Sequence, residues 1–137
     1  MDKHLFISCF LLVALNLVIA VAMFLRRVGD IKSGATDIKF FKTYDLNTTI
    51  PRVSRQLTRN FINQFETPVL FYVAIGFILI FKVNDSAFVS LAYLFSGLRI
   101  LHSLIHTSSN RIYPRMISFF SAYLVIMIIW VRLLLAL

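Results

Sequence analysis

The stretch Arg59–Phe81, RNFINQFETPVLFYVAIGFILIF, places a long apolar run directly behind a short polar stripe. Glu66, the only glutamate of the chain, stands where the apolar run begins, and Arg59 and Asn63 precede it. At about 100° per residue of helix, these three side chains fall within about 60° of one another. Ionisable groups on a membrane-entering helix usually face a protein interior or a watery cavity, so the stripe is a candidate functional site.

The composition predicts an integral membrane protein. Hydrophobic residues make up 59% of the 137 residues, and the mean hydropathy is +0.83. A soluble domain of this length could not bury so much apolar surface, so the solvent of the chain is lipid. The formal net charge of +8 does not form a groove-sized basic face, which argues against nucleic acid as a partner. The single cysteine, Cys9, excludes an intrachain disulfide and a cysteine-based metal site.

Four segments qualify as membrane-spanning helices. The length of each is close to the roughly 20 mostly apolar residues that a helix needs to cross a bilayer. They cover residues 5–25, 50–81, 86–107 and 112–137. The sequence therefore predicts an all-α integral membrane protein in which residues 1–137 form a single four-helix bundle.

The second of these helices is the longest and the least regular. A helix over 50–81 extends about 48 Å, which exceeds the ~30 Å hydrocarbon core, so its first turns project into water. Thr48 and Thr49 are candidates to cap its start, and Pro51 suits its first turn. Pro68 lacks an N–H, frees the carbonyl of Gln64 and predicts a kink. The segment 31–50 before it is expected to be an irregular loop.

Basic residues gather on one side of the predicted bundle. The loop 26–60 holds Arg26, Arg27, Lys32, Lys39, Lys42, Arg52, Arg55 and Arg59, and the loop 107–115 adds Arg111 and Arg115. The opposite side carries little beyond Lys3, Lys82 and Arg132. The positive-inside rule predicts that both termini lie outside and that the two basic loops are cytoplasmic.

A second polar stripe lies on the third predicted helix. Arg99, His102 and His106 fall within about 60° of one another, near the cytoplasmic end and level with the first stripe. Arg111 and Arg115 follow just beyond the turn. Two histidines at this spacing lack an evident third ligand, so no metal site is predicted.

These stripes favour an anionic ligand. Several guanidiniums grip carboxylates or phosphates, and a neighbouring Arg stabilises the thiolate of a bound thiol. Glu66 beside them indicates an ammonium or amide on the same ligand, or a structural ion pair with Arg99 or Arg59. A zwitterionic thiol peptide such as glutathione fits this description, although the residues equally allow other anions.

The joint pattern resembles the MAPEG family, the membrane-associated proteins in eicosanoid and glutathione metabolism. Arg59-x3-Asn63-x2-Glu66, closely followed by Pro68, is similar to the family signature. The stretch 99–106, RILHSLIH, with the basic residues after it, is similar to the third helix and third loop of the family. The resemblance covers nearly the whole chain and implies an uncharacterised bacterial-type member of the family.

The resemblance implies a homotrimer with a glutathione site between neighbouring subunits, open to the cytoplasm. It assigns glutathione binding to Arg59, Asn63, Glu66, Arg99, His106 and Arg26, and thiolate activation to Arg111 and Arg115. Arg99 is a further candidate for that activation. The partners implied are the lipid bilayer, glutathione and a lipophilic small molecule.

Some positions depart from the family pattern. Ile62 stands where family enzymes often carry an Arg, and His106 where prostaglandin synthases carry a Tyr. Met116 and Phe119 occupy the places of a Ser and a Tyr, which argues against prostaglandin synthase chemistry.

The first hypothesis for the function is an enzyme that conjugates glutathione to a lipophilic electrophile, or that uses glutathione to reduce a lipophilic electrophile or peroxide. The alternative is a non-enzymatic membrane scaffold or an anion- or lipid-binding protein.

Overall fold

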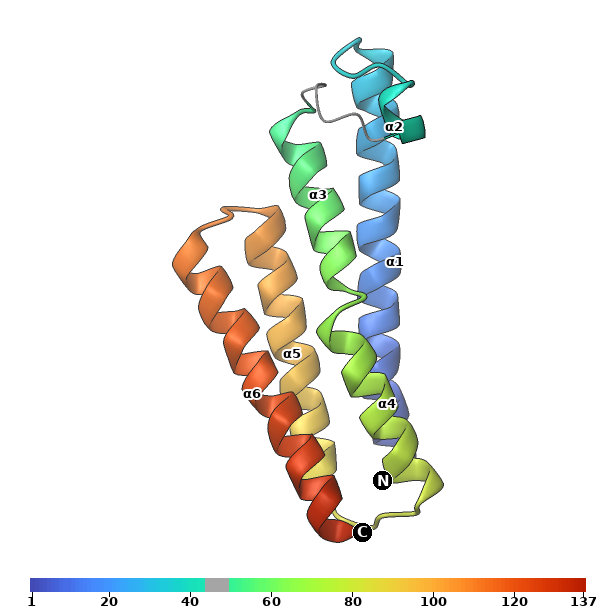
Figure 1. Cartoon of the computed structure of the whole chain (residues 1–137), viewed down its shortest axis with the longest axis vertical. Coiled ribbons are helices and arrows are strands. Elements are labelled where there is room, and N and C mark those ends of the chain that lie inside the picture. The colour runs from blue at the N-terminus through green and yellow to red at the C-terminus, as the bar shows by residue number, and fades with distance from the viewer. Residues whose placement is uncertain (44–49) are drawn as a thin grey trace.

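Four helical spans form the described part of the chain. The computed structural model describes residues 1–43 and 50–137, and there it has four stretches long and apolar enough to cross a membrane. Its helices are α1 (Asp2–Lys32), α2 (Phe40–Thr43), α3 (Arg52–Asn63), α4 (Thr67–Ile80), α5 (Ala87–Thr107) and α6 (Ile112–Ala136). α3 and α4 follow one another along one span, and both termini lie at the same end of the bundle (Figure 1). The predicted all-helical architecture with four candidate spans is confirmed.

An apolar core joins α1, α4, α5 and α6. Its members include Leu5, Leu12, Phe71, Ala74, Ile78, Phe88, Ala92, Phe95, Ala122, Ile126 and Ile129. Small residues allow helix backbones to approach closely inside a membrane, and Ala74, Ala92 and Ala122 are buried in this core on three of the helices. The rings of Phe71 and Phe95 stack at 4.5 Å between centroids. Because this core fills the end near the termini, polar side chains collect at the other end.

The second span is broken rather than bent. The sequence predicts one helix over 50–81 with a kink at Pro68, but residues 64–66 are not helical and separate α3 from α4. Pro68 lies in the first turn of α4, where its missing N–H costs no helical hydrogen bond. Pro51 directly precedes α3, while the predicted caps Thr48 and Thr49 lie outside the described residues. The break frees carbonyl groups at the end of α3.

The first helix is longer than the apolar pattern predicts. It runs from Asp2 to Lys32 rather than over 5–25, because polar contacts continue it beyond the apolar residues. Arg26 and Asp30 form an i, i+4 ion pair at 3.0 Å. Arg27 donates a hydrogen bond of 3.0 Å from Nη2 to Thr58 Oγ1 on α3. The expected irregular loop 31–50 therefore begins with helix and contains the short helix α2.

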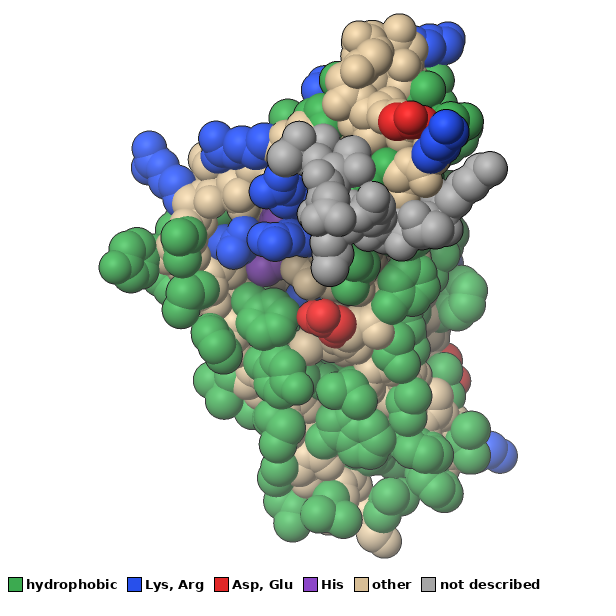
Figure 2. Space-filling view, turned by 45° about the horizontal axis from the view of Figure 1, so that its top comes forward, with side chains coloured by type: hydrophobic (Ala, Val, Ile, Leu, Met, Phe, Trp, Pro, Cys, Tyr) green, Lys and Arg blue, Asp and Glu red, His purple; other side chains and the backbone are tan. Residues whose placement is uncertain are grey.

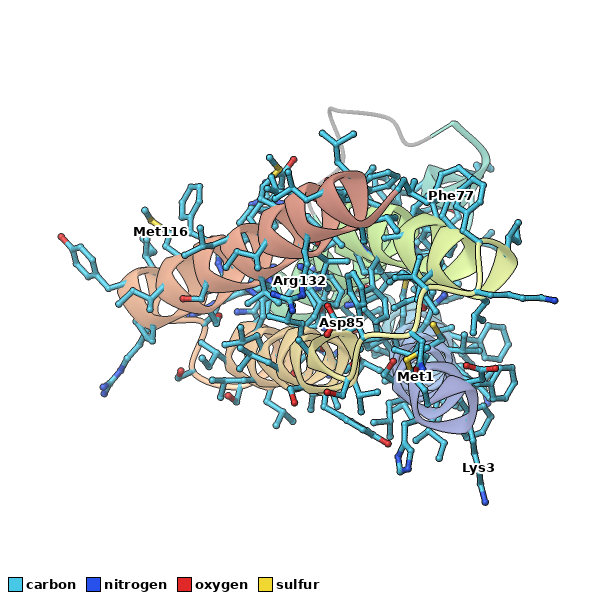
Figure 3. All side chains as sticks on the ribbon, turned by 90° about the horizontal axis from the view of Figure 1, so that it is seen from below. Met1, Lys3, Phe77, Asp85, Met116 and Arg132 are labelled. Atoms are coloured by element: carbon cyan, nitrogen blue, oxygen red, sulfur yellow. The ribbon has the colours of Figure 1, made fainter. Side chains whose placement is uncertain are left out.

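An ion pair joins the α4–α5 connection to α6 at the end of the bundle that holds the termini. Asp85, in the connection between α4 and α5, accepts a hydrogen bond from Arg132 Nε of α6, and Figure 3 shows the two side chains together, seen from below. This hydrogen bond from Arg132, and a second one from the backbone N–H of Ala87, hold the pKa of the Asp85 carboxyl below its ordinary value of 3.8. The contact ties the α4–α5 connection to α6.

Candidate functional site

A cavity of about 350 Å³ opens between α3, α5 and α6. Its lining residues on α5 and α6 lie near the turn that joins these two helices, at the end of the bundle away from the termini (Figure 1). It is lined by Arg59, Ile62, Asn63, Glu66, His102, His106, Arg115, Met116 and Phe119. Figure 2 shows Lys and Arg side chains gathered at this end, with histidine among them and hydrophobic side chains covering most of the rest of that face. The structure thus brings five of the predicted site residues to one cavity: Arg59, Asn63, Glu66, His106 and Arg115.

The lining has a polar part and an apolar part. Arg59 and Arg115 contribute two guanidiniums, and Glu66 contributes the single carboxylate. Ile62, Met116 and Phe119 are the apolar lining residues. A net cationic cavity of this kind accommodates an anion, and its apolar residues accommodate a hydrocarbon group beside that anion.

Arg99 lies behind this cavity rather than in its lining. The residue is 0% exposed, and its Nη2 donates a hydrogen bond of 2.6 Å to the carbonyl oxygen of Asn63. That carbonyl is free because the break after α3 interrupts the helical ladder. The guanidinium also lies 5.9 Å from the ring centroid of Phe119. Arg99 therefore fixes the end of α3 and adds positive charge directly behind the cavity.

The buried guanidinium of Arg99 is only partly satisfied. Its Nε and Nη1 are buried and have no hydrogen-bond partner within the part of the chain that the structure describes. Glu66 is exposed in the lining and makes no ion pair with Arg99 among the described contacts. The structural Glu66–Arg99 pair that the sequence left open is thus absent from this conformation.

His102 links α5 to the start of α6. Its Nδ1 lies 3.0 Å from the carbonyl oxygen of Arg115, and because a carbonyl only accepts, Nδ1 carries the hydrogen. Ser118 Oγ donates to the same carbonyl at 2.9 Å. Arg115 Nη1 in turn donates a 2.6 Å hydrogen bond to Asn110 Oδ1. These contacts set the orientation of Arg115 at the cavity.

His106 lies next to His102 in the lining. The two buried rings are 5.8 Å apart between centroids in an edge-to-face arrangement. His106 Nδ1 has no hydrogen-bond partner among the described residues. His102 Nε2 is likewise buried and without a hydrogen-bond partner among the described residues. No group of three His, Cys, Asp or Glu side chains that could hold a metal is found in residues 1–43 and 50–137.

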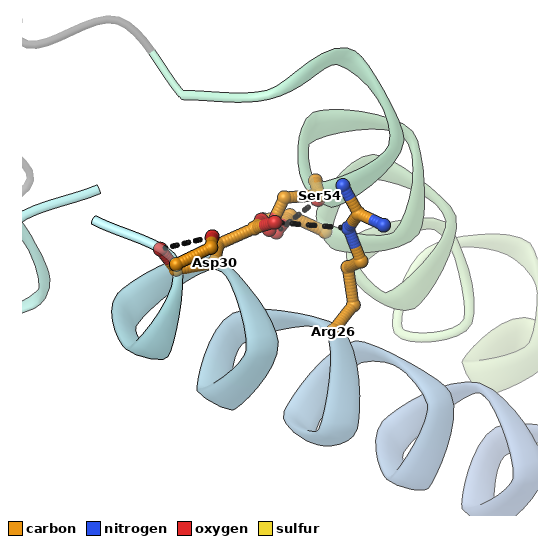
Figure 4. Close-up of polar contacts among 5 residues, drawn as sticks. Arg26, Asp30 and Ser54 are labelled. Carbon is orange, nitrogen blue, oxygen red and sulfur yellow. Dashed lines mark hydrogen bonds and ion pairs between the residues drawn. The ribbon is translucent and has the colours of Figure 1, made fainter. Parts of the chain in front are cut away.

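Two predicted site residues, Arg26 and Arg111, do not reach this cavity within one chain. Arg26 pairs with the buried Asp30 on α1, and Figure 4 shows Asp30 pointing towards α3, where Ser54 lies. Arg111 is exposed at the residue before α6. A place for either in the site thus requires a neighbouring chain, which stays a prediction.

Sequence reasoning missed a polar contact that positions α3. Asn60 is fully buried, and its Nδ2 donates to Ser103 Oγ of α5 at 2.7 Å. Gln64, one turn later, donates from Nε2 to Asn60 Oδ1 at 3.4 Å. Leu57, Asn60 and Gln64 are all buried, and they are spaced three and four residues apart along the chain. This helical spacing is the sequence signal that could have identified Asn60 as a buried residue. Asn60 holds one face of α3 to α5 while Arg59 and Asn63 face the cavity.

The comparisons with known proteins support one family. The sequence has no significant match among curated proteins or among solved structures. A model of the MAPEG family matches residues 5–135 of the 137-residue chain. With its four candidate spans, the chain is a multi-pass integral membrane protein. It belongs to the MAPEG family, the membrane-associated proteins of eicosanoid and glutathione metabolism.

Proposed function

We propose that the cavity binds glutathione and that the protein conjugates it to a lipophilic electrophile, or uses it to reduce a lipophilic peroxide. The observation that carries the proposal is the combination of Arg59, Arg115 and Glu66 around one cavity in a MAPEG protein. Glutathione has two carboxylates, one ammonium group and one thiol. The lining offers guanidiniums for the carboxylates and a carboxylate for the ammonium.

Four polar residues of the lining bind glutathione in this proposal. Arg59 and Arg115 bind carboxylates by charge-assisted hydrogen bonds, which are about twice as strong as neutral ones. Glu66 accepts from the ammonium, and the side-chain amide of Asn63 binds the peptide backbone of the ligand. Arg99 stays behind the wall and contributes through its charge, since its Nη2 is already bonded to the carbonyl of Asn63.

Positive charge around the cavity favours the thiolate form of the ligand. A free thiol has a pKa of about 8.5, and neighbouring guanidiniums lower it, so more thiolate is present at neutral pH. In conjugation the thiol proton passes to water, the sulfur forms a bond to the electrophilic carbon, and the leaving group departs with its electron pair. In peroxide reduction two glutathione molecules supply two electrons, the O–O bond breaks, and glutathione disulfide, an alcohol and water result.

The apolar lining indicates where the second substrate enters. Ile62, Met116 and Phe119 line the same cavity as the charged residues, and Ile62 and Met116 are themselves exposed. A lipophilic substrate can therefore arrive from the bilayer while the peptide arrives from water. Met116 and Phe119 offer no hydroxyl group, so the thiolate depends on guanidiniums in this protein.

The assembly and orientation belong to the same proposal. A homotrimer, with the cavity between neighbouring subunits, would allow Arg26 or Arg111 of one chain to complete the site of the next. In this proposal the cavity opens to the cytoplasmic side. The cations of the two basic loops support that orientation, because cations near the ends of spans favour the cytoplasmic side.

Ultraviolet absorbance of the thiolate tests the proposal directly. Purified protein mixed with glutathione is expected to show a thiolate band, whereas S-methylglutathione, which has no ionisable thiol, is expected to show none. Both compounds are expected to raise the thermal unfolding midpoint, because both carry the charged groups that the cavity binds. If glutathione gives no thiolate band and does not raise the unfolding midpoint, the proposal is contradicted.

A non-enzymatic anion or lipid binder is the second candidate. The observation that favours it is the apolar pair Met116 and Phe119, which leaves no hydroxyl group of α6 in the cavity lining. Thermal protection by both compounds without a thiolate band supports binding without activation. If Glu66→Gln and Arg59→Ala lower the stability of the oligomer but leave every ligand response unchanged, a scaffold role is supported instead.

A further inference from the structure

We propose that the turn after α1, residues 33–41, together with Lys32, forms a contact surface for the headgroups of an anionic bilayer. We refer to these residues as the headgroup surface. The inference does not depend on glutathione binding, because none of these residues lines the cavity.

The depth of this surface follows from the length of α1. The apolar residues 5–25 extend about 32 Å as a helix, which matches a hydrocarbon core of ~30 Å. Arg26 is the first charged residue after this stretch, so it marks the boundary of the hydrocarbon. The remaining residues to Lys32 add about 9 Å, which places the upper end of α1 beyond the boundary.

The chain then turns back towards that boundary. Gly34 has φ +72°, and the backbone N–H of Thr36 bonds to the carbonyl of Asp30 at 3.2 Å, so the direction reverses. Arg27 lies 5.0 Å from the ring centroid of Phe41, which returns the start of α2 to the level of Arg27. Figure 1 shows α2 beside α1 and below its upper end. The segment therefore lies at the depth of the headgroups rather than in bulk water.

The side chains of this segment suit an interface. Ile38 is 62% exposed, and the hydrophobic residues Phe24 and Leu25 are exposed at the end of the apolar stretch. Arg26, Lys32 and Lys39 are exposed cations around the same turn. An exposed apolar residue among cations is typical of segments that lie on anionic membranes.

The acidic residues nearby do not cancel this charge. Asp30 is buried and paired with Arg26. Asp37 is exposed, and its Oδ1 accepts the backbone N–H of Lys39 at 2.8 Å. The stretch 26–43 holds five Lys or Arg residues and two Asp residues, so it stays net positive.

Lipid quenching of a tryptophan tests the surface in the full-length protein. Ile38→Trp in a Trp130→Phe background places the single tryptophan of the chain on the exposed position. The protein is reconstituted into phosphatidylcholine vesicles that contain brominated phosphatidylglycerol or brominated phosphatidylcholine at equal mole fractions. We expect stronger quenching by the anionic lipid, and we expect the difference to vanish at 1 M salt, where the Debye length is about 3 Å.

Lysine variants separate local charge from general lipid contact. Lys32→Gln and Lys39→Gln are each expected to lower the preference for anionic lipid by up to about fivefold, the effect of one cation at an anionic surface. The matched variants Lys3→Gln and Lys82→Gln remove cations elsewhere in the chain, and we expect them to leave the preference for anionic lipid unchanged. Equal quenching by both lipids, no quenching at all, or indifference to Lys32 and Lys39 overturns the proposal.

Discussion

Arg59 and Arg52 are both exposed arginines of α3, but only Arg59 lines the cavity. If glutathione binds as proposed, Arg59→Gln removes a charge-assisted hydrogen bond worth about 1.5–3 kcal/mol. We therefore expect the dissociation constant of glutathione to rise by roughly 10- to 150-fold, measured by titration calorimetry.

Arg52→Gln is the matched control for this change. It removes the same charge from the same helix, so a general loss of cationic field would weaken binding in both variants. An equal effect of the two substitutions would contradict a specific role for Arg59.

The buried hydrogen bond between Asn60 and Ser103 is expected to stabilise the packing of α3 against α5. Ser103→Ala removes the hydroxyl that accepts from Asn60 Nδ2 and leaves a buried donor unpaired. Polar contacts between helices in membranes are worth about 1 kcal/mol. We expect a loss of that size in the free energy of unfolding in detergent.

The exposed Ser90→Ala on the same helix is the control and is expected to have almost no effect. In a double-mutant cycle with Asn60→Leu, the two losses should be less than additive. Full additivity would show that the two side chains do not act together.

At the scale of elements, the turn after α1 offers a comparison of two glycines. Gly34 has φ +72°, whereas Gly29 lies inside α1, and a Cβ added at either meets no atom within 4 Å. Gly34→Ala is therefore expected to cost about 1–2 kcal/mol through backbone strain alone. Gly29→Ala is expected to stabilise α1 by about 0.5–1 kcal/mol.

Hydrogen exchange of residues 33–41 and the thermal unfolding midpoint measure both changes. Faster exchange in Gly34→Ala and slower exchange at the end of α1 in Gly29→Ala are the expected results. Destabilisation by both variants would mean that the space around these positions is filled in the assembled protein.

The connection between α4 and α5 should respond to acid. Because hydrogen bonds hold the pKa of Asp85 below 3.8 in the folded protein, its contact with Arg132 stabilises the fold above about pH 4. That contribution is lost as the pH falls from about 4 through the lowered pKa. We expect the difference in unfolding midpoint between wild type and Asp85→Asn to be constant near neutral pH and to shrink below pH 4.

Arg132→Gln provides the complementary measurement. It removes the donor of the same contact, so it should resemble Asp85→Asn at neutral pH and add little to it in the double variant. A difference between wild type and Asp85→Asn that persists unchanged at pH 3 would argue against the ion pair as its source.

At the scale of the whole molecule, the proposed orientation and assembly can be measured together. Single cysteines at Asn84 and Ser109, in a Cys9→Ser background, should react with a membrane-impermeant maleimide from opposite sides of sealed vesicles. Light scattering in detergent should give a protein mass of about 47 kDa, three times the 15.8 kDa of one chain. Labelling from the same side, or a protein mass near 16 kDa, would contradict the respective proposal.

The helical membrane architecture and one polar stripe of the cavity follow from the sequence alone. Apolar runs of sufficient length define spans whatever their packing, because the bilayer requires internally satisfied backbone. Helical periodicity placed Arg59, Asn63 and Glu66 on one stripe, and all three line the cavity.

The position of the break in the second span, and the contact made there, could be found only from the packed helices. Pro68 predicts a disturbance, but the sequence does not show that the helix is interrupted at residues 64–66, nor that Arg99 of α5 donates a hydrogen bond to the Asn63 carbonyl there. Arg26 illustrates the same limit, since its pairing with Asp30 directs it away from the cavity of its own chain. Periodicity along one helix reports which residues share a face, whereas contacts between helices depend on packing that no local pattern contains.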